Sequence, residues 1–249
     1  MLQTMESVLI TFSGGVDSTF LAKAAFDVLG RNAVALTAVS PSLPAAELAQ
    51  AARLAERIGI RHQIVQSKEL EDPRYASNPV NRCYFCKSEL YGLASREAER
   101  LGLRWVLDGT QKDDLRDARP GRQAAKEWNV RSPLAETGWT KEEIRSASRE
   151  LGLPTWDKPE MACLASRIPH GTKVTVVGLG QVERCEEGLK ELGFRQLRAR
   201  HEGKAVRLEL DPEAISRLAD SDLTERVIRI CQEAGFRKVW VDLDGYRRS

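Results

Sequence analysis

The feature that most constrains the fold is a glycine turn placed between a short apolar run and a helical pattern near the start of the chain. The apolar run covers residues 7–12, Ser13-Gly14-Gly15 follows it, and apolar residues then recur at helical spacing over residues 20–29. We therefore predict a strand, a glycine turn and a helix. Adjacent glycines let the backbone approach an anion, and the free amides at a helix start point toward it.

The seven-residue turn SGGVDST has the composition of a phosphate-binding loop. It lacks the lysine of the GxxxxGK[ST] loop, and Asp17 within it is suited to help hold a magnesium ion beside phosphates. A tight turn capped by Ser13 or Asp17 is the alternative interpretation. The residues predicted to bind pyrophosphate in this loop are Ser13, Gly14, Gly15, Asp17 and Ser18.

Strands and helices alternate through the first part of the chain, which predicts a parallel sheet. The charged segment after Thr110 is expected to form a loop, and a helix is expected to begin at Thr140, where Glu143 completes the form of a capping box. The expected elements after the first helix are strands at 33–39, 62–66 and 105–107 and helices at 44–58 and 84–101.

The C-terminal part has a different pattern. A helix at 179–192 is followed by strands at 195–201 and 205–210, two helices, and a final strand at 238–243. We predict an α/β fold in which a parallel-sheet domain, residues 1–172, is followed by a smaller α+β domain, residues 173–249, for substrate binding or oligomerisation.

Charge and hydropathy restrict the class of protein. The 249 residues include 38 basic and 36 acidic ones, a formal charge of +2, so there is no net field to hold a long nucleic acid. The first residues lack the features of a secretory signal, and no run of about 18 apolar residues follows. We expect a cytoplasmic protein that binds neither a membrane nor nucleic acid.

Five cysteines are present, and their spacing separates two kinds. Cys83 and Cys86 form a CxxC at the expected start of a helix, where the dipole and flanking cations favour thiolates, and Cys163 lies in a loop. Cys185 and Cys231 fall in amphipathic helices and are expected in the core. Half a zinc site, a redox pair or chance also explain a single CxxC.

Three cysteines without a fourth ligand would suit a four-iron cluster (4Fe-4S) with one open iron, which could accept sulfide. The iron-sulfur ligands predicted on this basis are Cys83, Cys86 and Cys163, which are also the catalytic candidates.

The loop resembles that of the PP-loop ATP pyrophosphatases, whose signature is SGGxDS and which cleave ATP between its α and β phosphates. Within that resemblance, Gly109 and Thr110 of Asp108-Gly109-Thr110 belong to a second nucleotide-site segment. The family chemistry is activation of an acceptor as its adenylate, with release of pyrophosphate.

Over nearly the whole chain, SGGVDST, NPVNRCYFCK, WDKPEMACLASRIPHGTKV and QLRARHEGKAVRLEL together resemble the LarE family. Its members insert sulfur into the pyridinium dicarboxylate mononucleotide precursor of the nickel-pincer cofactor. The resemblance implies ATP and magnesium as cofactors, adenylation of a substrate carboxylate, attack by sulfur, and release of a thiocarboxylate with AMP. Sulfide or another sulfur donor, and a homo-oligomer, are also implied. Members with three cysteines resemble cluster users, whereas others surrender the sulfur of the cysteine matching Cys163.

Arginines near Cys163 and on the predicted C-terminal strands are the candidates for binding the mononucleotide, because guanidinium forks suit a phosphate. The predicted substrate-binding residues are Ser166, Arg167, Arg198, Arg200 and Arg207, and Glu186 is a further metal-ligand candidate. The alternative is that these charges mark solvent-exposed faces of a strand and a helix.

Three other functions fit parts of the same pattern. A tRNA thiolation enzyme of the PP-loop class would use the same steps and also CxxC cysteines, but the near-neutral charge and the lack of an obvious RNA-binding domain disfavour it. An amide-forming ligase would need ammonia and no thiolates. A nucleotide sensor would bind ATP without turning it over.

Overall fold

The computed structural model describes residues 1–116, 120–160 and 162–246. The chain forms two compact units, the first comprising Met1–Tyr75 and Asn81–Met161 and the second Ala76–Val80 and Ala162–Ser249. No helix in the described ranges is both long and apolar enough to span a membrane.

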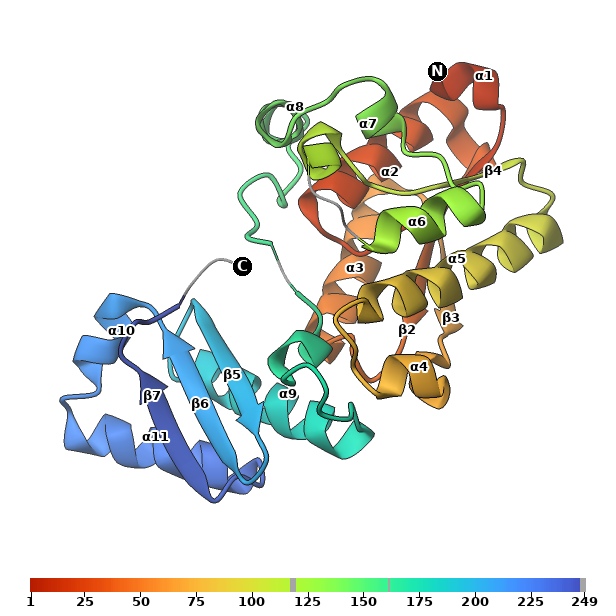
Figure 1. Ribbon diagram of the computed structural model, residues 1–249. Coiled ribbons are helices and arrows are strands. Elements are labelled where there is room, and N and C mark those ends of the chain that lie inside the picture. The colour runs from red at the N-terminus through yellow and green to blue at the C-terminus, as the bar shows by residue number, and fades with distance from the viewer. Residues whose placement is uncertain (117–119, 161, 247–249) are drawn as a thin grey trace. The chain divides into compact units, whose positions relative to one another are not determined.

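The first unit (Figure 1, red to green) is built on a four-stranded parallel sheet, which confirms the predicted α/β class, and the strand order is β3-β2-β1-β4. From β1 the chain proceeds outward to β2 and β3, and it then returns to add β4 on the other side of β1. The ends of β1 and β4 therefore form a switch point, where open α/β sheets bind ligands. The strands are β1 (Val8–Thr11), β2 (Ala33–Val39), β3 (Arg61–Gln66) and β4 (Trp105–Leu107).

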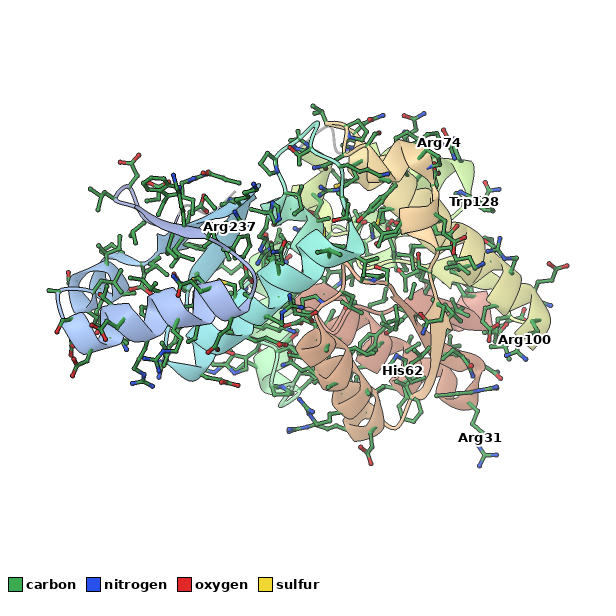
Figure 2. The ribbon with its side chains drawn as sticks, turned by 90° about the horizontal axis from the view of Figure 1, so that it is seen from below. Arg31, His62, Arg74, Arg100, Trp128 and Arg237 are labelled. Atoms are coloured by element: carbon green, nitrogen blue, oxygen red, sulfur yellow. The ribbon has the colours of Figure 1, made fainter. Side chains whose placement is uncertain are left out.

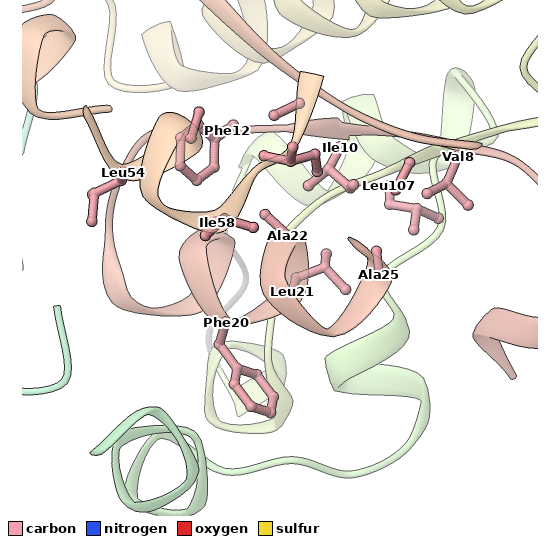
Figure 3. Close-up of a cluster of buried hydrophobic side chains, with 14 of the residues drawn as sticks. Val8, Ile10, Phe12, Phe20, Leu21, Ala22, Ala25, Leu54, Ile58 and Leu107 are labelled. Atoms are coloured by element: carbon pink, nitrogen blue, oxygen red, sulfur yellow. The ribbon is translucent and has the colours of Figure 1, made fainter. Parts of the chain in front are cut away.

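Helices cover both faces of this sheet. Val8 and Ile10 of β1 belong to a core that includes α2 (Val16–Leu29), α3 (Ala45–Ile58) and α8 (Lys141–Glu150), as Figure 3 shows for its central part. Leu9, which points to the opposite face, belongs to a second core with α5 (Arg82–Leu101) and α6 (Pro120–Glu127). The remaining short elements are α1 (Leu2–Met5), η1 (Gly30–Asn32), η2 (Glu69–Glu71), α4 (Pro73–Ala76), η3 (Lys112–Arg116) and α7 (Pro133–Glu136).

Two local predictions have different outcomes. The capping box is confirmed, since the Thr140 side chain accepts from the amide of Glu143 while the Glu143 carboxylate accepts from the amide of Thr140. The predicted loop after Thr110 is wrong for the described part, because η3 and α6 form there and two buried alanines of α6 pack in the core beside α5. Residues 117–119 of that segment lie outside the described residues.

The second unit contains a three-stranded sheet of order β5-β6-β7, with β5 and β6 antiparallel and β6 and β7 parallel (Figure 1, cyan to blue). Cys185 of α9 and Cys231 of α11 are fully buried with their sulfur atoms 3.4 Å apart, which confirms their predicted place in the core. The elements are η4 (Leu164–Arg167), α9 (Val176–Glu191), β5 (Leu197–Glu202), β6 (Ala205–Leu210), α10 (Pro212–Arg217), α11 (Ser221–Glu233) and β7 (Lys238–Asp242).

Candidate functional site

A cleft of about 350 Å³ lies at the carboxyl ends of β1, β2 and β4 in the first unit. Its walls come from the glycine loop, from the segment after β4 and from α5. The cleft lies outside the carboxyl ends of the strands and at the switch point, which is where open parallel sheets bind ligands. The lining residues include Ser13, Gly15, Asp17, Ser18, Thr37, Lys87, Leu90, Tyr91, Asp108, Gly109, Thr110, Asp114 and Arg122.

The glycine loop presents the start of α2 to this cleft. Gly15 is the N-cap residue, so the first amides of α2 have no carbonyl partner one turn earlier within the helix. The hydroxyls of Ser13 and Ser18 lie 3.1 Å apart, and the amide of Ser13 donates to the Ser18 hydroxyl at 3.3 Å. The loop is thus closed on itself by two hydroxyls while its amides remain at the anion-attracting end of the helix.

Gly14 has a backbone conformation and a neighbour that exclude any side chain. Its φ is +70°, and a Cβ atom would lie only 3.2 Å from the Cα and Cβ atoms of Ala51 in α3. An alanine at this position would be strained in φ and would push against α3. The first glycine of the turn is therefore required for the loop to lie close to α3.

Asp17 combines one paired and one unpaired carboxylate oxygen. Its Oδ2 accepts from the Lys141 ammonium at 2.7 Å, whereas its buried Oδ1 has no hydrogen-bond partner in the described parts of the chain. Burial raises the pKa of Asp17 above its ordinary value, and the hydrogen bond from Lys141 opposes this rise. A hard cation prefers such a carboxylate oxygen, so the residue fits a magnesium ion carried by a nucleotide.

The segment after β4 is organised by the buried carboxylate of Asp108. Its oxygens accept from the hydroxyls of Tyr91 at 2.6 Å, Thr110 at 2.9 Å and Ser132 at 2.7 Å, and from the amide of Thr110 at 3.1 Å. A Cβ atom on Gly109 would lie 3.0 Å from the amide nitrogen of Ser18. The two predicted nucleotide segments are therefore in direct contact, and glycine at 109 permits it.

One face of α5 carries both the CxxC cysteines and part of the cleft wall. Cys83, Cys86, Lys87, Leu90 and Tyr91 recur at helical spacing, and the last three line the cleft. Cys83 is exposed and Cys86 is half-buried. Burial raises the pKa of the Tyr91 hydroxyl, and the charges of Asp108 and Cys86 raise it further.

The other face of α5 borders a second pocket of about 510 Å³ in the same unit. The side chains of Arg74 and Trp128, labelled in Figure 2, lie on its walls together with Tyr84 and Phe85. The Arg74 guanidinium lies over the Phe85 ring, and the Tyr84 hydroxyl donates to Glu127. The two residues between the CxxC cysteines thus point away from the cleft.

In the second unit, Cys163 is exposed and lies at the N-cap of η4. Arg167, four residues later, is buried and donates to both carboxylate oxygens of Glu186, at 2.8 and 3.1 Å. One Glu186 oxygen also accepts from the amide of Ala199. Binding of a metal by Glu186 would therefore require the carboxylate to leave these partners.

The strand arginines are also held by carboxylates. Arg200 and Arg207 lie directly opposite each other on β5 and β6, and Glu209 accepts from both at 2.9 and 3.2 Å. Arg207 also donates to Glu202 and Asp242. Arg198 is buried with its guanidinium over the ring of Tyr246, 4.8 Å from the centroid.

The structure brings together the predicted nucleotide residues and adds several that the sequence patterns did not identify. Lys141 reaches Asp17 across 124 positions of sequence, and Lys87 and Tyr91 share the cysteine face of α5. Cys83 and Cys86 belong to the first unit and Cys163 to the second. Within the described ranges, no group of three or more His, Cys, Asp or Glu residues is arranged to hold a metal ion.

A parallel sheet with a glycine loop at its switch point and an acidic residue in that loop defines a nucleotide-binding α/β protein of the PP-loop class. Residues 2–76 match the family model described as NAD synthase, which belongs to that class. The chain belongs to the LarE family, the family of pyridinium-3,5-bisthiocarboxylic acid mononucleotide synthase.

Three relatives illustrate this similarity. The synthase of that name from Lactiplantibacillus plantarum is 38% identical over 248 residues, covering 99% of this chain and 89% of the relative. The uncharacterised protein slr1717 of Synechocystis is 50% identical over 243 residues, covering 98% of this chain and 91% of the relative. The tRNA-specific 2-thiouridylase MnmA of Thermus thermophilus is 28% identical, covering 63% of this chain and 53% of the relative.

Proposed function

We propose that this chain is an ATP-dependent sulfurtransferase that converts a carboxylate of pyridinium dicarboxylate mononucleotide into a thiocarboxylate. The full-length identity of 38% to a protein named for the bisthiocarboxylic product supports this substrate class. Among the contacts in the molecule, one observation carries the proposal. A single helix, α5, lines the nucleotide cleft with Tyr91 and bears the cysteines Cys83 and Cys86 on the same face.

The first step proposed is activation. The substrate carboxylate attacks the α-phosphorus of ATP, the bond to the β-phosphate oxygen breaks, and pyrophosphate leaves. The amides at the start of α2 and the cations Lys87 and Lys141 would receive the departing negative charge, because helix starts and ammonium groups favour phosphate oxygens. Asp17, whose Oδ1 has no hydrogen-bond partner in the part of the chain that the structure describes, would hold a magnesium ion that neutralises the phosphates.

The second step proposed is transfer of sulfur. A sulfur nucleophile attacks the acyl carbon of the adenylate, the bond to the AMP oxygen breaks, and a thiocarboxylate and AMP are formed. Adenylation makes the carboxylate oxygen a good leaving group, so the two proposed steps replace one difficult displacement.

The proposed sulfur centre uses Cys83, Cys86 and Cys163. Their donor chemistry fits an iron-sulfur cluster, since thiolates are its usual ligands and all three cysteines lie outside the core, in contrast to Cys185 and Cys231. A four-iron cluster bound by three cysteines would retain one iron open to sulfide and would supply the sulfur. The chain's own part is to provide the three thiolates, of which Cys83 lies at the favourable start of α5.

In the second unit, we propose that Ser166, Arg167, Arg198, Arg200 and Arg207 recognise the mononucleotide, whether by direct contact or by holding the arginine framework. Arg167 donates to the Ser166 hydroxyl, and Arg200 donates to the carbonyl oxygen of Ser166. The segment after Cys163 is thereby tied to β5. An incoming phosphate would have to compete with Glu209 for Arg200 and Arg207.

The test is anaerobic purification of the native chain and of the variant C83A/C86A/C163A, followed by analysis of iron, sulfide and products. The native chain is expected to contain iron and sulfide and to form AMP, pyrophosphate and a thiocarboxylate. The triple variant should lose iron and thiocarboxylate but still adenylate the substrate. C185A/C231A is the matched control, and it should retain both activities if it folds.

The outcomes separate the alternatives. An iron-free native chain that still forms thiocarboxylate would overturn the cluster and leave Cys163 as a sacrificial donor. Unchanged thiocarboxylate formation by the triple variant would overturn cysteine-dependent transfer altogether. Thiolation of bulk tRNA in place of the mononucleotide would favour the activity for which MnmA is named.

A further inference from the structure

The side chain of Lys158 is bound to the back of the glycine loop. The residue follows α8 near the end of the first unit, and its side chain is 11% exposed. Its ammonium donates to the carbonyl oxygen of Gly14 at 3.1 Å, to Glu47 Oε2 at 2.6 Å and to Gln50 Oε1 at 2.7 Å. These three contacts match the three donors of a lysine ammonium.

The contact with Gly14 determines the direction of the next amide. All described peptide bonds are trans, so the carbonyl of Gly14 and the amide N–H of Gly15 point in opposite directions across one planar unit. Gly15 lines the cleft, whereas neither Gly14 nor Lys158 is among the residues described as lining it. The hydrogen bond from Lys158 to the Gly14 carbonyl, on the side of the loop away from the cleft, therefore directs the Gly15 amide toward the cleft.

The loop needs such an external anchor. Gly14 and Gly15 are adjacent, and glycine has more backbone freedom than any other residue. The Gly15 amide lies 3.3 Å from the Ser13 hydroxyl, which is a long hydrogen bond within the loop itself. Glu47 and Gln50 of α3 hold the lysine beside Ala51, the residue that contacts Gly14.

We infer that Lys158 is a positioning residue for phosphate binding: it orients the Gly14–Gly15 peptide so that the Gly15 amide binds the phosphates that ATP has and AMP lacks. This inference rests on the proposed function, because it assumes that ATP binds in the cleft. A plain salt bridge between Lys158 and Glu47, with only a stabilising role for α3, is the competing explanation.

The experiment compares the native chain with Lys158→Met, Lys158→Arg and the double variant Glu47→Gln/Lys158→Met. Binding of magnesium with α,β-methylene ATP, and of AMP alone, is measured by calorimetry. Lys158→Met is expected to weaken binding of the ATP analogue by roughly tenfold or more, the effect of losing a charge-assisted hydrogen bond. Its affinity for AMP should remain native, and Lys158→Arg should restore part of the loss.

The double variant Glu47→Gln/Lys158→Met separates the loss of the contact with Gly14 from the effect of an unpaired charge on Glu47. Removing the lysine alone leaves the Glu47 carboxylate without its cation, and that charge could repel phosphates from a distance. The double variant removes the charge but not the defect at Gly14, so it should bind the ATP analogue as weakly as Lys158→Met.

Three results would overturn the inference: native affinity of Lys158→Met for the ATP analogue, equal weakening for the analogue and for AMP, or recovery in the double variant. A native chain that binds neither nucleotide would instead overturn the proposed function, and the inference with it. If Lys158→Met does not fold, Lys158→Arg still decides, because a bulkier cation at the same position should disturb analogue binding and not AMP binding.

Discussion

The glycine loop of the first unit and the arginine strands of the second are both candidate phosphate-binding regions, but their polar groups are in opposite states. The loop places helix-start amides at a cleft that Asp17 also lines, and the buried Oδ1 of Asp17 has no hydrogen-bond partner among the described residues. On the strands, Arg200 and Arg207 already bind the carboxylate of Glu209. The loop is therefore prepared for an anion, whereas the strands must exchange one anion for another.

This difference indicates in which region phosphate binding would have to break interactions that stabilise the folded chain and in which region it would not. A group without a partner in the folded chain gains when a ligand arrives, since its desolvation cost is already included in folding. A paired arginine gains only the difference in interaction free energy between its carboxylate partner and the phosphate that replaces it. Variants of the two regions should therefore affect stability in opposite directions.

The largest effect is expected from Glu186→Gln in the second unit. The carboxylate and the Arg167 guanidinium are each only 4% exposed, so removing one charge leaves the other buried without compensation. The expected loss is about 3 kcal/mol in the free energy of unfolding, measured by urea titration.

The control for that variant is Arg167→Met/Glu186→Leu, in which both charges are absent and stability should be close to native. Native stability of Glu186→Gln, together with loss of a bound metal ion, would contradict the framework role and favour the metal ligand predicted from sequence.

Asp17→Asn should reduce AMP formation about 100-fold, the scale of removing one electrostatic group from an active site. The same variant should unfold at a higher temperature at pH 7. Burial raises the pKa of Asp17, so the folded chain holds the proton more tightly than the unfolded chain, and ionisation costs stability as pH rises above 3.8. Asparagine does not ionise, so we expect an increase in Tm on the order of 2 °C.

That gain in Tm should disappear when both proteins are compared at a pH well below the unfolded pKa of 3.8, where Asp17 is protonated in both states. A lower Tm for Asp17→Asn at pH 7 would show that the ion pair with Lys141 outweighs the cost of burial.

Thr140→Ala tests the support of the loop from α8. It removes the capping box at the start of the helix that carries Lys141, the partner of Asp17. We expect a loss of about 1 kcal/mol in the free energy of unfolding. AMP formation should fall less than for Asp17→Asn, because Lys141 remains in place. Thr140→Ser should retain the cap and native stability.

The smallest effect is expected for Arg207→Met. Its guanidinium is paired with Glu202, Glu209 and Asp242 but is about one-third exposed, so solvent screens these pairs. A loss of about 0.5 kcal/mol is expected. Mononucleotide affinity, measured by calorimetry, should weaken more than stability does; an unchanged affinity would remove Arg207 from the substrate site.

Much of the first unit follows from local patterns. The β1, loop and α2 unit, the alternation of strands and helices, and the capping box at Thr140 all depend on residues close in sequence, and the structure confirms them. The segment at α6 was not predicted as a helix, because its lysine, arginine and glutamate residues obscure the two alanines that pack beside α5.

The partners of the site could not be read from spacing. Lys141 and Lys158 reach the loop from 124 and 144 positions away, and only the fold brings them there. Arg198 and Arg200 are two residues apart on β5 and therefore share a face, but the register that places Arg200 opposite Arg207 depends on how β5 pairs with β6. Glu209 between them offsets what would otherwise be like charges in direct opposition.

The hydrogen bond from Tyr91 to Asp108 fixes the position of α5, so the helix sets the distance between its cysteines and the nucleotide segment. The helix rises about 1.5 Å per residue, so Cys86 and Cys83 lie roughly 7.5 and 12 Å along its axis from Tyr91, the residue that contacts the nucleotide segment. Inserting a single residue between Cys86 and Tyr91 would lengthen that spacing only slightly, but it would turn the cysteines by about 100° away from the cleft face. The effect of an insertion in α5 on activity would therefore depend on how far it rotates the cysteines about the helix axis. Adding a whole helical turn should reduce activity less than adding one residue.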